Sequence, residues 1–206
     1  MLKRIIWMVA ITSTCLLNAA SANPIIFAPS GTTLTTGQVR AEAAASSDNA
    51  NGQYYWLSTG LMQYEVDLLK FHADNGRDET QMGAQWSFLP ETLFTPAVGF
   101  GVRDLTSQSK EGIGFYTAIT RHLPLSIFSP ILKDFALTAG FGVAGVHGPF
   151  CGFEAKLPWN IFAQGEYDSR DINAALGWQP NKYFRLKTYS IRSEFYFGAE
   201  IPPIQF

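Results

Sequence analysis

The sequence predicts an all-β fold, an antiparallel up-and-down barrel of about 10–12 strands, and three observations support this prediction. Between Gly152 and Trp178, three short segments each place apolar residues on one face and polar residues on the other. Strict alternation of this kind is typical of strands with two unlike faces. The separators at 157–160 and 168–170 are short enough for hairpins. The composition, with 16 Phe, 8 Tyr, 5 Trp and 18 Gly but only 16% charged residues, suits tightly packed strands.

The chain begins with the features of a secretory signal peptide. Two basic residues precede an apolar run from Ile5 to Leu17, and Ala20-Ser21-Ala22 supplies an A-x-A cleavage site. We expect cleavage after Ala22, so that the mature chain begins at Asn23. The apolar run is shorter than the ~20 residues that a membrane-spanning helix needs, which disfavours an uncleaved anchor.

Length, charge and cysteine content set further bounds. A chain of 206 residues favours one domain. The net charge of -2 and the pI near 5.9 give no reason to expect a nucleic-acid partner, and no basic cluster appears. Because Cys15 lies within the signal, Cys151 would stand alone in the mature chain and could not form an intrachain disulfide.

The mature chain divides into a short lead-in and the predicted barrel. Residues 23–36 contain two prolines and a Ser-Gly-Thr-Thr run, which predict an extended lead-in. From Gly37 to Phe206 the alternation continues, apart from a break at Leu68-Leu69 where we expect a β-bulge. The other segments with strand character are 38–45, 54–58, 63–71, 80–88, 96–103, 113–120, 135–143, 184–188 and 194–201.

The two faces of these segments differ in a way that favours a membrane barrel. The apolar face carries large aromatic residues, whereas the other face carries glycines, small residues and charges of both signs. Turned inward, the aromatic residues would crowd one small core; turned outward, they would meet lipid while the charges pair across the lumen. The predicted lumen-facing charges are Arg40, Glu42, Glu65, Asp67, Arg103, Glu154, Lys156, Glu166, Asp171, Arg185, Lys187, Glu194 and Glu200. A soluble periplasmic β-protein, with the apolar face inward, is the alternative.

The connections between segments alternate in character. Every second connection is polar or flexible, and those between them are short or contain proline. With about twelve strands, this pattern returns the C-terminus to the periplasmic side, as an even-numbered barrel requires. The exception is the long apolar connection from His122 to Asp134, which contains two prolines.

Part of the chain resembles a known family. Residues 152–155 followed by 163–178 are similar to barrel repeats of bacterial outer-membrane proteins linked to exopolysaccharide export, in which a G-x-E-Y-like strand precedes an A-E-Y-D-x-R-D-x-N-x-G hairpin. The similarity extends over most of 53–201. It implies a Gram-negative outer membrane as the location, with outer-membrane lipid, the barrel-assembly machinery and polysaccharide as partners. The chain departs from the family at its end, where Pro202-Pro203 precede Phe206 and proline cannot donate to a ladder.

Little in the sequence indicates catalysis. The three histidines are His72, His122 and His147, and none lies in a recognisable motif. An outer-membrane lipid hydrolase using His72 with a rim serine is the enzymatic alternative. No spacing resembles a metal site or a phosphate-binding loop, so no cofactor is expected. The glycine pairs, such as Gly99/Gly101 and Gly140/Gly142, indicate close packing and barrel curvature.

The predicted function is therefore passive. The chain would be a narrow pore or a structural component of the envelope, linked through its resemblance to surface polysaccharide export. The inward charges could form a paired network in a closed lumen, or line a polar pore for ions or sugars. A barrel of about twelve strands lies between filled eight-stranded barrels and open porins, so its width does not decide between the two forms, and we expect a plugged or very narrow barrel.

Overall fold

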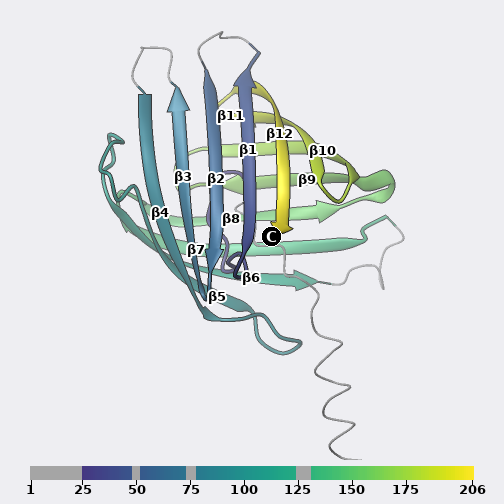
Figure 1. Ribbon diagram of the computed structural model, residues 1–206, viewed down its shortest axis with the longest axis horizontal. Helices are drawn as coiled ribbons and strands as arrows, with labels where there is room; N and C mark the ends of the chain where they lie inside the picture. Colours follow the sequence, from purple (N-terminus) through teal and green to yellow (C-terminus); the bar gives the residue numbers. More distant parts are fainter. Residues whose placement is uncertain (1–24, 48–51, 73–77, 124–130) are drawn as a thin grey trace, which may run out of the picture.

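The structure, a computed structural model, describes residues 25–47, 52–72, 78–123 and 131–206. Within them, twelve strands form one closed antiparallel barrel in which each strand pairs with its sequence neighbours and β1 closes against β12 (Figure 1). This confirms the predicted fold class. The predicted signal peptide and its cleavage site lie outside the described residues. No described helix is long and apolar enough to cross a bilayer.

Each predicted segment overlaps one strand of the barrel. A single 3-10 turn, η2 (Pro158–Asn160), connects β8 and β9. The strands are β1 (Gln38–Ser46), β2 (Gln53–Leu61), β3 (Tyr64–His72), β4 (Asp78–Leu89), β5 (Ala97–Arg103), β6 (Gly114–Leu123), β7 (Asp134–Ala144), β8 (Gly148–Lys156), β9 (Ile161–Tyr167), β10 (Ile172–Asn181), β11 (Phe184–Ile191) and β12 (Glu194–Gln205).

Figure 1 shows the shape of the barrel. Strands β1, β2, β3 and β12 run roughly upright on the near side, and β7, β8 and β9 run across behind them. We call the end where β1 begins and β12 finishes the terminal end, and the opposite end, where β1 finishes and β2 begins, the distal end. The inner faces of the two walls look toward each other, so side chains from both can fill the space between.

The polar face of the strands is the buried one. On the outside, Leu176 is 55% and Phe197 is 60% exposed, whereas Arg40 and Glu200 on the inside are 1% and 0% exposed. This is the reverse of a water-soluble β-protein, whose strands turn their apolar face inward. The alternation along each strand therefore produces a barrel with an apolar outer surface and an interior that holds the charged side chains.

Strand β3 corrects one expectation. It pairs with β2 and β4 from Tyr64 to His72 without a shift in register, so the predicted β-bulge at Leu68-Leu69 is wrong. Leu69 is partly buried and packs against the apolar cluster inside the barrel. The strand keeps its period of two, and what changes is the chemistry of its inner face, from acidic near Glu65 to apolar toward the distal end.

Strand β12 passes through the proline pair. It continues to Gln205, which pairs with Gln38, and the register with β1 shifts between Val39 and Ala41. The irregularity lies beside Pro202-Pro203, where the ladder lacks the proline donors. The backbone N–H of Phe206 then donates to the carbonyl of Gly37 at 3.1 Å.

The predicted lead-in lies inside the barrel. We call residues 25–36 the N-terminal segment; it forms no strand, and most of its side chains are buried in the lumen. Ile25 and Leu34 are 5% and 0% exposed. The segment joins β1 at the terminal end, where Gly37 N donates to Gly60 O at 3.1 Å.

Inward glycines provide the space for rings that lie across the wall. A Cβ at Gly101 would lie 2.2 Å from the ring of Tyr116, and one at Gly177 would lie 2.2 Å from the ring of Phe162. Such distances do not occur between real atoms, so the ring occupies the place of the missing side chain. The period-two glycines thus belong to the packing of the lumen.

We predict that Gly177→Ala destabilises the barrel by about 1–3 kcal/mol, because the new methyl group displaces the Phe162 ring. Urea unfolding in detergent micelles would measure the change, and Phe162→Leu in the same chain should recover part of it. Gly165→Ala is the matched control, because the nearest atoms to its Cβ belong to the Phe153 ring on the outer face, where the ring can turn away from the barrel. Equal losses for both alanine variants would contradict the packing role.

Candidate functional site

The lumen contains a cluster of four charged side chains from three adjacent strands. Arg40 on β1 lies 2.7 Å from Glu42 through Nη2 and 3.1 Å from Glu200 through Nε. Lys187 Nζ on β11 lies 3.2 Å from Glu42 and 2.5 Å from Glu200. All four side chains are at most 4% exposed. We call Arg40, Glu42, Lys187 and Glu200 the ionic cluster.

Neighbouring polar groups complete the ionic cluster. The hydroxyl of Tyr54 donates to Glu42 Oε1 at 2.8 Å and that of Tyr189 donates to the same atom at 2.5 Å. Arg185 Nη1 lies 3.8 Å from both Glu200 and Glu154. With these two residues added, three cations face three carboxylates. Buried charges are tolerated when they are paired and hydrogen-bonded in this way.

Strand register brings these residues together. Glu42 lies directly opposite Glu200 across the β1–β12 pair, and Arg185 lies opposite Glu200 across the β11–β12 pair. Arg40 and Glu42 share the inner face because they are two residues apart. The closure of the barrel between its first and last strands is therefore the seam along which the ionic cluster forms.

A second set of polar side chains holds the N-terminal segment, beginning at its tip. The N–H groups of Ile26, Phe27 and Ala28 donate to the carboxylate of Glu166 at 2.8 to 3.0 Å. Asn173 Nδ2 donates to the same carboxylate at 2.9 Å. Charged acceptors make strong hydrogen bonds to backbone N–H groups, so Glu166 fixes this turn of the segment.

The rest of the N-terminal segment is also held by its main chain. Gly31 N donates to Thr120 Oγ1 and Leu34 N donates to Glu65 Oε2, both at 2.8 Å. Gln85 Nε2 donates to the carbonyl of Thr32 at 3.0 Å, and the guanidinium of Arg103 donates to the carbonyl of Phe27. The barrel wall thus recognises the backbone of the segment, while apolar contacts take up its side chains.

Those apolar contacts fill the space between the walls. Ile25, Ile26 and Ala28 belong to one buried cluster with aromatic residues from both walls, including Tyr54 and Phe150. The ring of Phe27 stacks on that of Trp56 with centroids 6.3 Å apart. Two small cavities flank the segment at Ser30 and Thr32, each with room for on the order of one or two water molecules. The N-terminal segment therefore fills this part of the lumen.

The structure distributes the predicted lumen charges among five places. Six join the ionic cluster or its extension, and Glu65, Arg103 and Glu166 hold the N-terminal segment. Asp67 lines a cavity beside Arg103, and Lys156 pairs with Asp134 at 3.0 Å toward the terminal end. Asp171 and Glu194 lie at the distal rim: Asp171 pairs with Arg192, and the exposed Glu194 accepts a hydrogen bond from the hydroxyl of buried Tyr196 at 2.9 Å. The six are Arg40, Glu42, Glu154, Arg185, Lys187 and Glu200.

Sequence reasoning missed the uncharged members of the site. Tyr54, Tyr189, Asn173, Gln85 and Thr120 all lie on the inner face and supply hydrogen bonds there. Each lies on the same face of its strand as the predicted lumen charges, and this alternation could have identified them. No local signal marks the N-terminal segment as a lumen occupant, because its contacts lie on remote strands.

The histidines lie at the two rims. His72 Nδ1 faces the carboxylate of Asp78, which also pairs with Lys70 Nζ at 3.1 Å. His122 binds Glu91 through Nδ1 at 2.6 Å and through its backbone N–H at 2.7 Å. Within the predicted long apolar connection from His122 to Asp134, residues 124–130 lie outside the described residues. In the described part of the chain, no three His, Cys, Asp or Glu side chains group as metal ligands.

Ion pairs link the loops at the distal rim. Arg170 pairs with Glu111 and lies 3.0 Å from His147 Nδ1 through Nη2. The hydrogen bond from Arg170 lowers the pKa of Glu111 and raises the pKa of Arg170 in turn. These contacts connect the β5–β6, β7–β8 and β9–β10 loops on the surface.

Comparisons with known proteins give only a distant likeness. No protein-family model matches the chain, and no curated protein matches it. Two solved structures of engineered variants of the Rhodobacter blastica porin are similar, with TM-scores of 0.35 and 0.34 and 9% sequence identity. Each alignment covers 75% of this chain and 56% of the porin chain, so the chain spans little more than half the porin's length. At these TM-scores the likeness identifies neither the family nor the function of the chain.

We predict that Lys187→Met destabilises the barrel by about 3–5 kcal/mol, because Glu42 and Glu200 would lose a shared buried cation. Unfolding in urea would measure the loss. The control is Arg192→Met, whose exposed pair with Asp171 should contribute no more than about 1 kcal/mol. A loss at Lys187 as small as that at Arg192 would contradict the role of the ionic cluster.

A second prediction concerns Asp104, a buried residue that organises the β5–β6 loop. Its carboxylate accepts hydrogen bonds from Gln108 N, Ser109 N and Ser109 Oγ at 2.5 to 3.0 Å. Burial opposes ionisation, but these hydrogen bonds lower the pKa of Asp104 below 3.8. Because the folded pKa is the lower one, the stabilisation is present above pH 3.8 and is lost as the pH falls through the folded pKa.

We therefore expect the loop to resist pepsin at pH 4 and above, about the ordinary aspartate pKa, and to become cleavable as the pH is lowered further. In Asp104→Asn, the loop should be cleaved at all of these pH values, since the charged acceptor is gone. A wild-type loop that is cleaved equally across the range would contradict the prediction.

Proposed function

We propose that this chain is an outer-membrane β-barrel of a Gram-negative-type bacterium, closed at rest and passive in its role. The single observation that carries the proposal is the inversion of the two faces, with apolar residues outside and charges inside. Large apolar patches on a soluble monomer mark interaction sites or cause aggregation, and here the apolar surface surrounds the barrel. A lipid bilayer is the environment that covers such a belt.

The distribution of charge on the outer surface supports this proposal. On the described strands, charged side chains that point outward lie near strand ends: Lys70, His72, Asp78 and Arg121. Between them the outer surface carries aromatic and aliphatic side chains, such as Tyr55, Met82 and Phe100. Charged residues cost most at the bilayer midplane and little at its interfaces, so this arrangement suits a membrane-spanning barrel.

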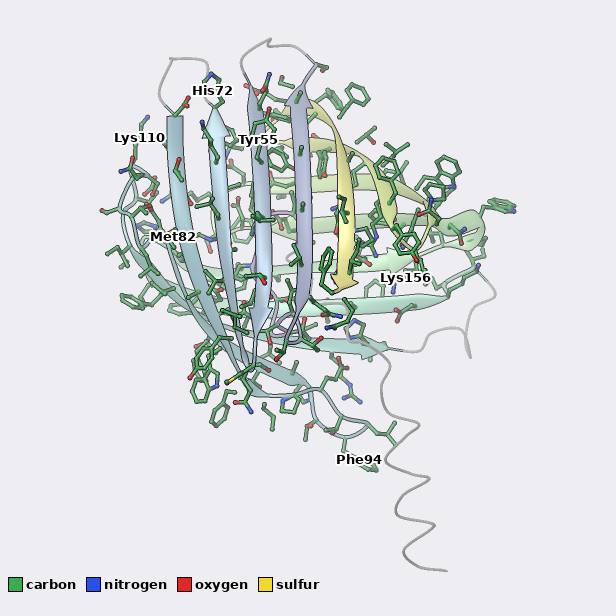
Figure 2. The ribbon with its side chains drawn as sticks, in the orientation of Figure 1. Tyr55, His72, Met82, Phe94, Lys110 and Lys156 are labelled. Carbon is green, nitrogen blue, oxygen red and sulfur yellow. The ribbon has the colours of Figure 1, made fainter. Side chains whose placement is uncertain are left out.

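The two ends differ in polarity. At the terminal end, connections carry the exposed apolar side chains Met62, Phe94 and Trp159. The distal loops carry charged residues such as Lys110 and Arg170, and Figure 2 shows Phe94 and Lys110 at opposite ends of the molecule. Aromatic residues occur at both interfaces of a membrane barrel, so we assign the terminal end to the periplasm because β1 begins and β12 finishes there, as in even-numbered outer-membrane barrels.

The closed lumen favours a structural role over an open pore. The ionic cluster and the N-terminal segment occupy interior space that a sugar passing through the barrel would need. A narrow pore is the second candidate, and it requires movement of the segment. Purified protein in planar bilayers tests the choice: low or rare conductance supports the closed form, and a steady, large conductance contradicts it.

The link to surface polysaccharide is a finer proposal that rests on the resemblance of residues 152–178 to export-associated barrels. Deletion of the gene should reduce the amount of surface polysaccharide. Two further expectations are independent of this link: the mature protein should begin at Asn23, and its insertion should depend on the barrel-assembly machinery. Unchanged polysaccharide in the deletion strain would remove the export link without affecting the barrel assignment.

An enzymatic role has one supporting observation. His72 Nδ1 faces a carboxylate, as in a catalytic dyad, but both side chains are exposed and Lys70 shares the same carboxylate. Hydrolysis of lipid substrates that is lost in His72→Ala would favour this role. Absence of activity in the wild-type protein would remove it.

The membrane assignment predicts how much a charge on the apolar outer surface lowers the stability of the barrel. Leu176→Arg, midway along β10, should destabilise the folded barrel in lipid vesicles by about 2–4 kcal/mol, because arginine at the bilayer midplane is costly. The control Gln53→Arg lies at the distal end of β2, where the cost should be about 0–1 kcal/mol. A soluble protein would tolerate both changes, since each replaced side chain lies on the outside.

The folded state of each variant can be followed by gel mobility of boiled and unboiled samples. An unboiled band that migrates differently, in a fraction that resists carbonate extraction, supports the barrel in the membrane. Protein that washes off in carbonate and shows no shift would support the soluble alternative instead.

A further inference from the structure

The N-terminal segment differs chemically from the wall that holds it. No residue from Ile25 to Gly37 is charged, whereas the wall groups that bind it include Glu65, Arg103 and Glu166. These wall groups contact backbone N–H and carbonyl groups, so each could exchange its partner for water. The only covalent connection between the described segment and the barrel is the chain at Gly37, at the terminal end.

The wall charges separate into two populations. In the ionic cluster and its extension, three cations pair with three carboxylates, and none of these side chains bonds to the segment in the described contacts. Along the path of the segment, the described cations are Arg103 and Lys156, and Lys156 pairs with Asp134 at 3.0 Å. The described carboxylates there are Glu65, Asp67, Asp134 and Glu166. If the segment leaves, Glu166 loses three N–H donors and Glu65 loses one. The vacated path then carries an excess of carboxylates.

From these contacts we propose that the N-terminal segment is a displaceable plug, and that the passage it vacates conducts cations in preference to anions. Carboxylates in a narrow, low-dielectric passage attract cations and repel anions. The proposal rests on the membrane-spanning barrel proposed above. It adds a conducting state and the class of solute that passes.

Glycines in the barrel wall leave the space that the N-terminal segment occupies. A Cβ at Gly60 would lie 2.2 Å from the carbonyl of Thr35, and one at Gly152 would lie 2.4 Å from the Ile25 side chain. Removal of an extended chain leaves a space on the order of 5 Å across, which admits ions with part of their hydration shell but excludes folded polymers. The cavities on either side of Ser30 and Thr32 would join this space.

A side chain added at one glycine of the segment, Gly31, would displace the segment from the wall. A Cβ at Gly31 would lie 2.7 Å from Ala97 O and 2.9 Å from both Ala118 O and Thr120 N. All three atoms belong to the backbone of β5 and β6, so no side chain can turn away. In Gly31→Ala, the segment has to leave its place, while the barrel wall keeps its own hydrogen bonds.

The experiment compares full-length wild type with Gly31→Ala in planar bilayers under a KCl gradient. We expect a several-fold higher open probability for the variant, with a reversal potential of the sign given by K⁺ flow. The matched control is Gly165→Ala, whose new methyl group lies on the outer face, and it should conduct as the wild type does. Adding Glu65→Gln and Asp67→Asn to Gly31→Ala should keep the conductance and reduce the preference for K⁺.

A chemical readout follows the segment itself. In a Cys151→Ser background, Ser30→Cys places a thiol on the buried part of the segment, since Ser30 is 5% exposed. Its reaction with a membrane-impermeant maleimide should be slow in the otherwise wild-type chain and several-fold faster with Gly31→Ala. Glu166→Gln, which weakens the clamp on the three N–H groups, should accelerate the reaction by a second route and serves if Gly31→Ala does not fold.

The outcomes separate this proposal from the membrane assignment. A thiol that stays protected in both Gly31→Ala and Glu166→Gln, in protein with a normal gel shift, shows that the segment is a fixed part of the core and overturns the proposal. A reactive thiol without conductance, or with anion preference, overturns the cation passage. Loss of the gel shift in wild-type protein would instead refute the membrane-spanning barrel.

Discussion

The pairing of charges inside the barrel is the constraint on which the rest of the structure depends. Because the outer face of every described strand is apolar along most of its length, each charged side chain between the rims has to find its partner in the lumen. The side chains of Arg40, Glu42, Lys187 and Glu200 form ion pairs with one another near the seam where β1 meets β12. Charges left unpaired in this interior would destabilise the fold. Because the pairs join β1 to β11 and β12, they form only when the barrel closes.

The N-terminal segment binds the buried carboxylates that the ionic cluster does not pair. Glu166 and Glu65 have no described cation within ion-pair distance, and the segment supplies backbone N–H donors to both. It also covers inward glycines at Gly60 and Gly152, whose lack of a side chain would otherwise leave space beside the wall. The lumen is thus filled by two different means, paired charges on one side and a backbone held by acceptors on the other.

Sequence reasoning succeeded where the determining pattern is local. A period of two sorts the faces within a single strand, so the inward positions of Arg40, Lys187 and Glu200 follow from their neighbours. It failed where register or distant contacts decide. Glu166 lies 138 residues from Ala28 and Arg40 lies 160 residues from Glu200, and no local pattern encodes such pairs. The apparent break at Leu68-Leu69 misled because a lumen-facing leucine was taken for a change of phase.

Glu166 connects the two halves of this architecture. As an acceptor of three backbone N–H groups and the Asn173 amide, it stabilises the closed lumen with its charge neutralised by dipoles rather than by a cation. Dipoles from a peptide segment can leave with that segment, whereas an arginine or lysine fixed to a strand cannot. A barrel in which a tethered, uncharged peptide binds two of the carboxylates, while the wall pairs its other charges, can expose those carboxylates to the lumen without unfolding its sheet.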